Sequence, residues 1–394
     1  SYSQLSKIHY IPPLTSGATG NNPPNEQWFH ISTPSELPVN FTIKRGDGSE
    51  FYSDNVTNTD PWTGRANLSD NNNDLYGYLF ASENETEQLL TQHGFIIEAD
   101  QEIYVSLRFI SGSNNHAGAL VSKGESALGT RFRAGSLQVG SGHLSFVSLM
   151  ATEDNTLVSF DLSTAILSGQ NGLLNVGPLS RGQSYVVAVD ESLMGVIGTL
   201  IESNKPIVVN SGSGVGSFAV GSAGGQDFGV DQIVGVNLVG SEYIFVKGQG
   251  QNGWENVLIV AHTDNTKIYI NGSSTPEVNP DTGLSFLNAG QYLLIEGDKY
   301  SNNNNMYVQA DAPVYAYQGI AGGGPANQSM FFVPPLKCSS IGNVNNIPEI
   351  DKIGTYTFVG RLNIVSEVGA TITISDKNNT NQPIANLVSN LQPY

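Results

Sequence analysis

Cysteine and positive charge are scarce in this sequence. The 394 residues include one cysteine, Cys338, so the chain can form neither an internal disulfide nor a zinc site of the CxxC type. Lys and Arg together number 17 against 35 Asp and Glu, which gives a formal net charge of -18. A surface of this sign repels phosphate backbones and anionic lipids, and it therefore excludes nucleic acid as a partner.

Long apolar runs and catalytic spacings are also missing. No run of about 18 apolar residues occurs, so the sequence predicts no transmembrane segment. The six histidines show neither the HxH nor the HExxH spacing of zinc sites, and there is no GxSxG motif of a serine hydrolase. We therefore expect a protein that is not an enzyme.

The chain is rich in glycine and in short runs that alternate apolar and polar residues. There are 44 glycines, and hydrophobic residues make up 39 % of the sequence, which is enough for large cores. Runs such as LVSFDL (157–162) and YIFVKG (243–248) alternate apolar and polar residues, as half-buried strands do, whereas helical periodicity is rare. These features predict an all-β protein.

One pattern of strands and turns recurs along the chain. LSFVSLMATEDNTLVSF (144–160) returns as NVLIVAHTDNTKIYI (256–270), and further pairs keep nearly the same separation. The separations are 110 residues for Asn155 and Asn265, 108 for Gln183 and Gln291, and 107 for Pro206 and Pro313.

Fainter copies lie at both ends, because residues 8–43 parallel residues 331–374 around a shared PPL. We expect about three and a half tandem β-rich repeats of roughly 105–110 residues, either sandwich-like or propeller-like. In a closed ring the N-terminal residues would complete the last repeat. The predicted domains are a first repeat with long loops (1–118), a second (119–228), a third (229–330) and a partial fourth (331–394).

The repeated polar motifs are predicted to be turns. Asp154-Asn155 and Asp264-Asn265 join alternating runs, and Asp and Asn cap turns and tolerate left-handed backbone angles. We also expect hairpin turns at Asn204–Pro206 and Asp311–Pro313, where proline fixes one torsion angle. The glycine-rich stretches 211–217, 221–226 and 321–327 are expected to be linkers or tight loops.

GQGQNG (248–253) fits the GxGxxG pattern of dinucleotide sites. The residues that follow, WENVLIVAH, predict a strand rather than the helix such a site needs. We therefore expect no nucleotide there.

Two features remain as candidate binding sites. Asp70, Asn72 and Asp74 place oxygen ligands at alternate positions, as calcium loops do, although Leu75 and Ala81 stand where an EF-hand loop needs Gly and an acid. We therefore expect a solvated polar loop and no cofactor, with a calcium site at these three residues as the alternative. Trp62, in the predicted loop DPWTGR, is the aromatic residue best placed to face a ligand.

The repeat resembles the N-terminal domain of IgGFc-binding proteins. The resemblance rests on ATEDNTLVSF, LSRGQSYVVAV, GTLIESNKPIVVNSG, HTDNTKIYI, LNAGQYLLI and FFVPPL, and it covers residues 95–375 well. Such domains occur in animal mucus proteins and in very long surface proteins of gliding Bacteroidetes that carry a type IX secretion signal. The start SYSQLSKIHYIPPL and the lack of cysteines are similar to the bacterial kind. The resemblance implies an exported adhesin and transfers no functional residue.

The expected function is non-enzymatic adhesion at a bacterial cell surface. The first residues look like an end left by signal cleavage, and we expect the chain to be the first part of a longer secreted adhesin or filament linked to gliding motility. The expected partner is a carbohydrate or protein on a surface, or another secreted or cell-surface protein of the same cell. The alternatives are a secreted carbohydrate-active enzyme and a structural spacer or capping module.

Overall fold

The computed structural model shows an all-β chain with 52 % of residues in strands and 6 % in helices. This confirms the predicted fold class. The structure describes residues 4–16, 24, 26–64, 76–111, 116–139, 143–190, 195–218, 226–321, 328–336, 344, 347–360, 362–366, 369–375 and 381–383.

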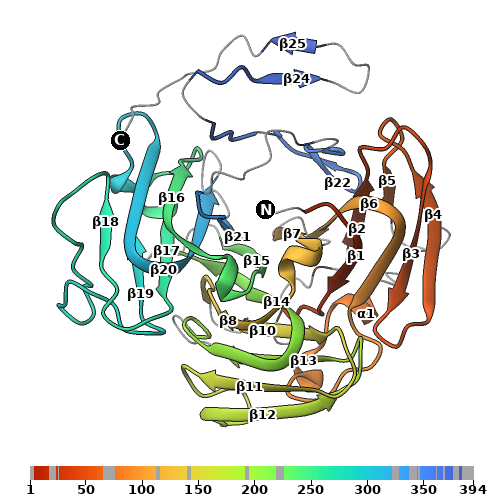
Figure 1. The fold of residues 1–394 in the computed structure, drawn as a ribbon, viewed down its shortest axis with the longest axis horizontal. Helices are drawn as coiled ribbons and strands as arrows, with labels where there is room; N and C mark the ends of the chain where they lie inside the picture. Colours follow the sequence, from red (N-terminus) through yellow and green to blue (C-terminus); the bar gives the residue numbers. More distant parts are fainter. Residues whose placement is uncertain are drawn as a thin grey trace.

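Three antiparallel sheets follow one another along the chain, and each is built around one long strand (Figure 1). The long strands are β6 (Phe95–Ile110), β14 (Leu200–Ser217) and β20 (Asn305–Ala321). We refer to each sheet together with the connection that follows it as a unit: the first unit (6–128), the second unit (129–239) and the third unit (240–335).

Each long strand lies between two pairs of neighbours. Its first half pairs with the first strand of its unit on one edge and with β3, β11 or β18 on the other. Its second half pairs with β2, β10 or β17 and with the last strand of the unit. The repeated sequence pattern is therefore a repeated topology.

The remaining strands of the first unit are β1 (Ser6–Ile11), β2 (Glu26–Ser32), β3 (Val39–Arg45), β4 (Glu50–Val56), β5 (Trp62–Gly64) and β7 (Ala117–Val121). Those of the second unit are β8 (Gly129–Arg133), β9 (Gln138–Val139), β10 (Leu144–Ala151), β11 (Thr156–Leu162), β12 (Gly172–Leu179), β13 (Ser184–Asp190) and β15 (Asp227–Ile233). Those of the third unit are β16 (Gly240–Val246), β17 (Val257–Ala261), β18 (Ile268–Ile270), β19 (Tyr292–Ile295) and β21 (Gln328–Phe332).

Helices are short and lie in connections. They are α1 (Tyr76–Leu79) and the 3-10 helices η1 (Glu83–Glu85), η2 (Gly124–Ala127), η3 (Val236–Leu238), η4 (Asn252–Trp254) and η5 (Gly297–Lys299). None of the described helices has the length and apolar character needed to cross a bilayer.

The Asp-Asn-Thr motifs form the same turn twice. Asn155 and Asn265 have φ values of 58° and 59°, in the left-handed region that asparagine tolerates. The Asp154 carboxylate accepts the backbone N–H of Arg181 at 2.9 Å, and Asp264 accepts that of Ala289 at 3.0 Å. Both aspartates are therefore used in the framework, as the turn prediction requires.

The predicted hairpin turns at Asn204–Pro206 and Asp311–Pro313 are wrong, because these residues lie inside β14 and β20. They occupy the place where the long strand changes partner, from β11 to β10 and from β18 to β17. The Asn204 side chain accepts the N–H of Leu157, and Asp311 accepts that of Lys267, both at 2.8 Å. Proline is tolerated where the pairing is interrupted, because it has no backbone N–H to donate to a neighbouring strand.

The glycine-rich stretch 211–217 is not a linker but the buried second half of β14. A Cβ on Gly212 would lie 2.0 Å from the Gly229 oxygen, and one on Gly214 would lie 2.3 Å from the Ser16 oxygen. Glycine is needed here because neighbouring backbones approach closely. Residues 221–225 and 322–327 lie outside the described residues.

Consecutive units share their cores. The core of the first unit includes Phe146 and Phe228 of the second, and the core of the second includes Tyr315 and Phe332 of the third. Phe228 packs edge-on against Phe109 with ring centroids 5.1 Å apart. The units are arranged around a common centre, and β15 packs against both β7 and β21 (Figure 1).

The described residues of the C-terminal segment (347–383) form two small hairpins. They are formed by β22 (Lys352–Ile353) with β23 (Tyr356–Thr357), and by β24 (Thr373–Ser375) with β25 (Asn381–Pro383). The segment lies between the first and third units (Figure 1). The N-terminal strand β1 pairs with β6 of its own unit and does not complete this segment. Whether the units are separate domains stays a prediction.

Candidate functional site at the junction of the three units

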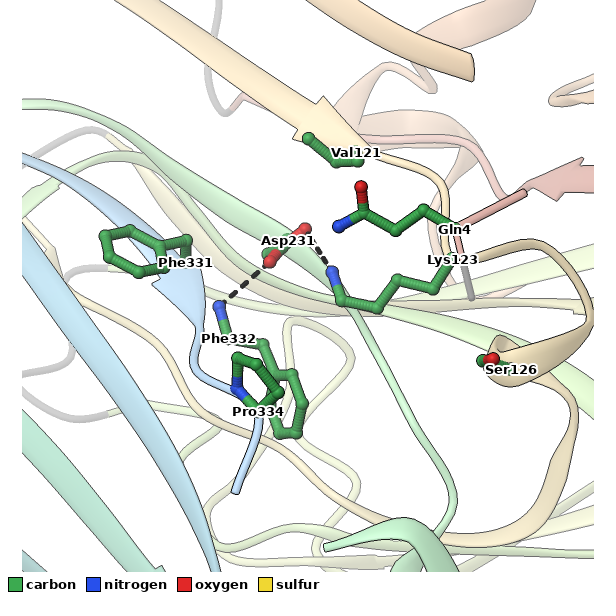
Figure 2. Close-up of a pocket in the computed structure, with 8 residues that line it drawn as sticks. All are labelled: Gln4, Val121, Lys123, Ser126, Asp231, Phe331, Phe332 and Pro334. Carbon is green, nitrogen blue, oxygen red and sulfur yellow. Dashed lines mark hydrogen bonds and ion pairs between the residues drawn. The ribbon is translucent and has the colours of Figure 1, made fainter. Parts of the chain in front are cut away.

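A pocket of about 310 Å³ lies where the three units meet (Figure 2). We call it the central pocket. Its walls come from the N-terminal residues, the end of the first unit with η2, the inner strand β15 and the end of the third unit. The lining residues are Gln4, Val121, Lys123, Ser126, Asp231, Phe331, Phe332 and Pro334.

A buried ion pair connects the units at this pocket. The Lys123 ammonium donates to Oδ1 of Asp231 at 2.8 Å, and the two side chains are 8 % and 7 % exposed. The backbone N–H of Phe332 donates to Oδ2 of Asp231 at 2.9 Å (Figure 2). One carboxylate of the second unit thus holds a side chain of the first unit and the backbone of the third.

Hydrogen bonds of the neighbouring residue Gln232 hold both members of the ion pair in place. Asp231 Oδ1 also accepts the N–H of Gln232 at 2.8 Å, and Gln232 Oε1 accepts the N–H of Lys123 at 2.7 Å. The Gln232 amide donates to the Tyr10 carbonyl at 2.9 Å. A buried charge is stable only when such partners are present, so this network specifies one arrangement of the units.

His9 extends the polar network. Its Nδ1 lies 2.9 Å from Ser122 Oγ, and its Nε2 lies 3.0 Å from the Ile103 carbonyl. Burial lowers the pKa of His9 to about 4, although its hydrogen bonds with the Ile103 and Ser6 carbonyls act in the opposite direction. His9 is therefore neutral at pH 7, and Lys123 carries the positive charge at the pocket.

The pocket has one charged wall and one apolar wall. Phe331, Phe332 and Pro334 line the pocket together with the Lys123–Asp231 pair, and the Lys123 ammonium lies 5.9 Å from the centroid of the Phe332 ring. Such a pocket suits a small ligand or side chain with an apolar body and a polar end. Among the described residues, no cluster of three or more His, Cys, Asp or Glu side chains could hold a metal ion.

Trp62 lies elsewhere, on the first unit. It begins β5, opposite Ile31 of β2, rather than lying in a loop. Its ring stacks on Tyr52 with centroids 5.0 Å apart and an interplanar angle of 29°, and it is half-buried. The Tyr52 hydroxyl donates to Asp54 at 2.9 Å, and burial together with this bond raises the pKa of Tyr52. Trp62 remains a candidate ligand-facing residue.

Asp70, Asn72 and Asp74 lie outside the described residues, so the calcium site stays a prediction. They follow Trp62 by fewer than fifteen positions in the chain. Trp62, the candidate residue that the structure describes, does not line the central pocket. Asp231 could have been noticed, because it is a single charge inside the otherwise uncharged run FGVDQIVGV.

The glycine loop 248–253 binds a carboxylate of the protein itself. The backbone N–H groups of Gly248 and Gly250 donate to the two oxygens of Glu255, at 2.9 and 2.8 Å. Glu255 is fully buried, and β17 follows it. The amides that would meet a phosphate in a nucleotide site are thus already used.

A search of proteins with curated descriptions gives no match. A family model described as IgGFc binding protein matches residues 117–391, which is more than half of the chain, and it confirms the resemblance seen in the sequence. The chain belongs to the IgGFc-binding protein family.

Proposed function

We propose that this protein is an extracellular, non-enzymatic binding module that attaches a cell surface to a carbohydrate or protein partner. The observation that carries the proposal is membership of a family described by its binding of a protein. The recurring polar residues support the proposal, because their side chains accept backbone N–H groups and so stabilise the framework rather than face a ligand. These residues are Asp154, Asp264, Asn204 and Asp311. Recognition then falls to loops and exposed side chains on a rigid frame.

The proposed setting is the surface of a gliding bacterium. Resemblance of the N-terminal SYSQLSKIHYIPPL to long type IX-secreted surface proteins, together with the single cysteine, favours this origin over an animal mucus protein. In this setting the chain would serve in a secreted adhesin or filament linked to gliding motility. The formal charge of -18 would favour basic or cation-bridged partners.

The proposed recognition surface is the Tyr52–Trp62 stack with the adjoining residues 65–75. Both rings pack against the core of the first unit and are half-exposed, and sugar rings or apolar side chains pack on half-exposed aromatic rings of this kind. Asp70, Asn72 and Asp74, which follow Trp62 in the chain, would hold a calcium ion through oxygen ligands that suit this metal. A bound calcium would also offset part of the negative charge.

The central pocket does not favour the carbohydrate-active enzyme. Glycoside hydrolysis in most families uses two facing carboxylates. The lining residues supply one, Asp231, and it is already paired with Lys123 and with the N–H of Phe332.

A binding screen tests the proposal. The purified chain is applied to glycan arrays and coated surfaces in millimolar calcium and again with chelator, alongside Trp62→Ala and the control Trp254→Ala, another half-buried tryptophan. We expect binding that falls at least about tenfold in Trp62→Ala and persists in Trp254→Ala. Loss in chelator would support the calcium loop. A folded protein that binds no surface, or equal binding by both variants, would contradict the proposal.

A further inference from the structure

The ion pair at the central pocket keeps hydrogen-bonding groups for a ligand. An ammonium group has three N–H donors, and a carboxylate has about four lone-pair positions. Among the described residues, Asp231 Oδ1 accepts from the Lys123 ammonium and from the N–H of Gln232, both at 2.8 Å, and Oδ2 accepts the N–H of Phe332 at 2.9 Å. Two N–H donors of Lys123 and one position on Asp231 Oδ2 are thus left to bind a ligand.

These groups act in a setting where hydrogen bonds are strong. Both side chains of the pair are more than nine-tenths buried, and hydrogen bonds to charged groups are about twice as strong as those between neutral groups. The polar ends of Gln4, Lys123 and Asp231 point toward one another (Figure 2). A ligand group that both donates and accepts is therefore bound well here, and a hydroxyl is such a group.

The charges of the pocket favour a neutral ligand. Lys123 and Asp231 are the charged residues among those that line it, and their formal charges cancel. A carboxylate on the ligand would lie beside Asp231, and an ammonium would lie beside Lys123. Either charge would lose its hydration without a net opposite charge to replace it, so charged ligands are disfavoured.

The apolar wall and the volume define the rest of the ligand. Val121, Phe331, Phe332 and Pro334 supply apolar surface beside the pair. A ring with C–H groups on one face and hydroxyls at its edge meets both kinds of surface. The volume of about 310 Å³ lies at the lower end of the range for small-molecule sites, about 300 to 1,000 Å³, and suits a single ring.

We propose that the central pocket binds one neutral sugar unit. The Lys123 ammonium donates to a hydroxyl oxygen of the sugar, and a neighbouring hydroxyl donates to Asp231 Oδ2. The C–H face of the ring packs on the apolar wall. Trp62 does not line this pocket, so the proposed site is independent of recognition at Trp62.

Binding at this place also links the units. Lys123 belongs to the first unit, Asp231 to the second and Phe331 to the third, and all three line the pocket. A ligand that contacts all three binds the assembled chain and not the unfolded one, so it stabilises the assembly by mass action. The sugar should therefore raise the unfolding temperature as its concentration rises.

Calorimetric titration of the intact chain with single sugars tests the inference. The probes are glucose, galactose and mannose, each with its methyl glycoside, its uronate and its amino sugar. We expect saturable binding of at least one neutral hexose, with its uronate and amino sugar at least about tenfold weaker. Binding of the methyl glycoside as well would identify the terminal unit of a glycan as the ligand, whereas binding of the free hexose alone would identify a free sugar.

Val121→Phe fills the pocket without changing the ion pair, and it should weaken binding at least about tenfold. Val278→Phe is the matched control, because Val278 is an exposed valine of the third unit that does not line the pocket. Gln4→Ala is a second variant at an exposed position, and it should also weaken binding. Circular dichroism checks that each variant is folded.

Trp62→Ala should bind the sugar as the unaltered chain does, which separates this site from the proposed recognition surface. A folded chain that binds none of the neutral sugars would overturn the inference. Equal binding by Val121→Phe and Val278→Phe would also overturn it, as would a uronate or amino sugar that binds as tightly as its neutral parent.

Discussion

Individual glycines set how closely the units can approach. A Cβ added to Gly182 would lie 1.9 Å from the Gly46 oxygen of the first unit, and one added to Gly198 would lie 2.0 Å from the Gly290 oxygen of the third. Real Cβ atoms do not approach backbone oxygens so closely, so each junction depends on a pair of glycines. Gly182 and Gly290 also have φ values of 84° and 83°.

Gly182→Ala should therefore destabilise the protein through two effects. The left-handed angle costs a non-glycine residue about 1 to 2 kcal/mol, and the clash with Gly46 adds backbone displacement at the junction. Gly169→Ala is the control, because Gly169 has φ 83° and nothing within 4 Å of the added Cβ. Urea unfolding should show that Gly182→Ala loses at least about 2 kcal/mol more than Gly169→Ala. Equal losses would show that the junction accommodates the methyl group.

At the scale of elements, the sequence predicted some turns correctly and others incorrectly. The turns at Asn155 and Asn265 were predictable because asparagine's tolerance of left-handed angles is a local property. The prolines at 206 and 313 were misread, since a proline marks an interruption of the ladder but does not show whether the chain reverses there. That depends on the strands alongside, which are distant in sequence.

The polar residue at each bend should be exchangeable between units. Asp100, Asn204 and Asp311 occupy the bends of β6, β14 and β20 and accept the N–H groups of Asn40, Leu157 and Lys267. Asn204→Ala removes the acceptor, and the free energy of unfolding should fall by about 1 kcal/mol. Asn204→Asp keeps the acceptor and should stay within about 0.5 kcal/mol of the unaltered protein in urea unfolding. An equal loss in both variants would show that this hydrogen bond contributes nothing.

At the scale of the whole molecule, the sequence predicted the repeated architecture but not the central pocket. Repetition is visible because equivalent turns recur at nearly constant separation. The residues of the pocket are not repeated: Lys123 ends the first unit, Asp231 lies in the second, and Phe332 ends the third with its backbone N–H. A contact that is made once between three units leaves no periodic pattern in the sequence. A backbone N–H donor can belong to any residue except proline, so the residue type at position 332 does not reveal it.

The ion pair at the centre should couple the three units. Asp231→Ala leaves Lys123 as a buried charge without its partner and removes the acceptor for the Phe332 N–H, so we expect a loss of about 3 to 5 kcal/mol. Lys123→Met leaves Asp231 with its two backbone donors and should cost less. The double variant should be more stable than the sum of the single losses predicts, because neither charge is then left alone.

Urea unfolding of the four proteins in this cycle, followed by tryptophan fluorescence and by circular dichroism, measures both the coupling and the cooperativity. Trp28 and Trp62 lie in the first unit and Trp254 in the third, so fluorescence reports on both. We expect the two signals to coincide in the unaltered protein and to separate in Asp231→Ala, as the third unit loses its attachment. Additive losses with coincident transitions would mean that the shared apolar cores alone hold the units together, and that the buried pair serves the pocket rather than the assembly.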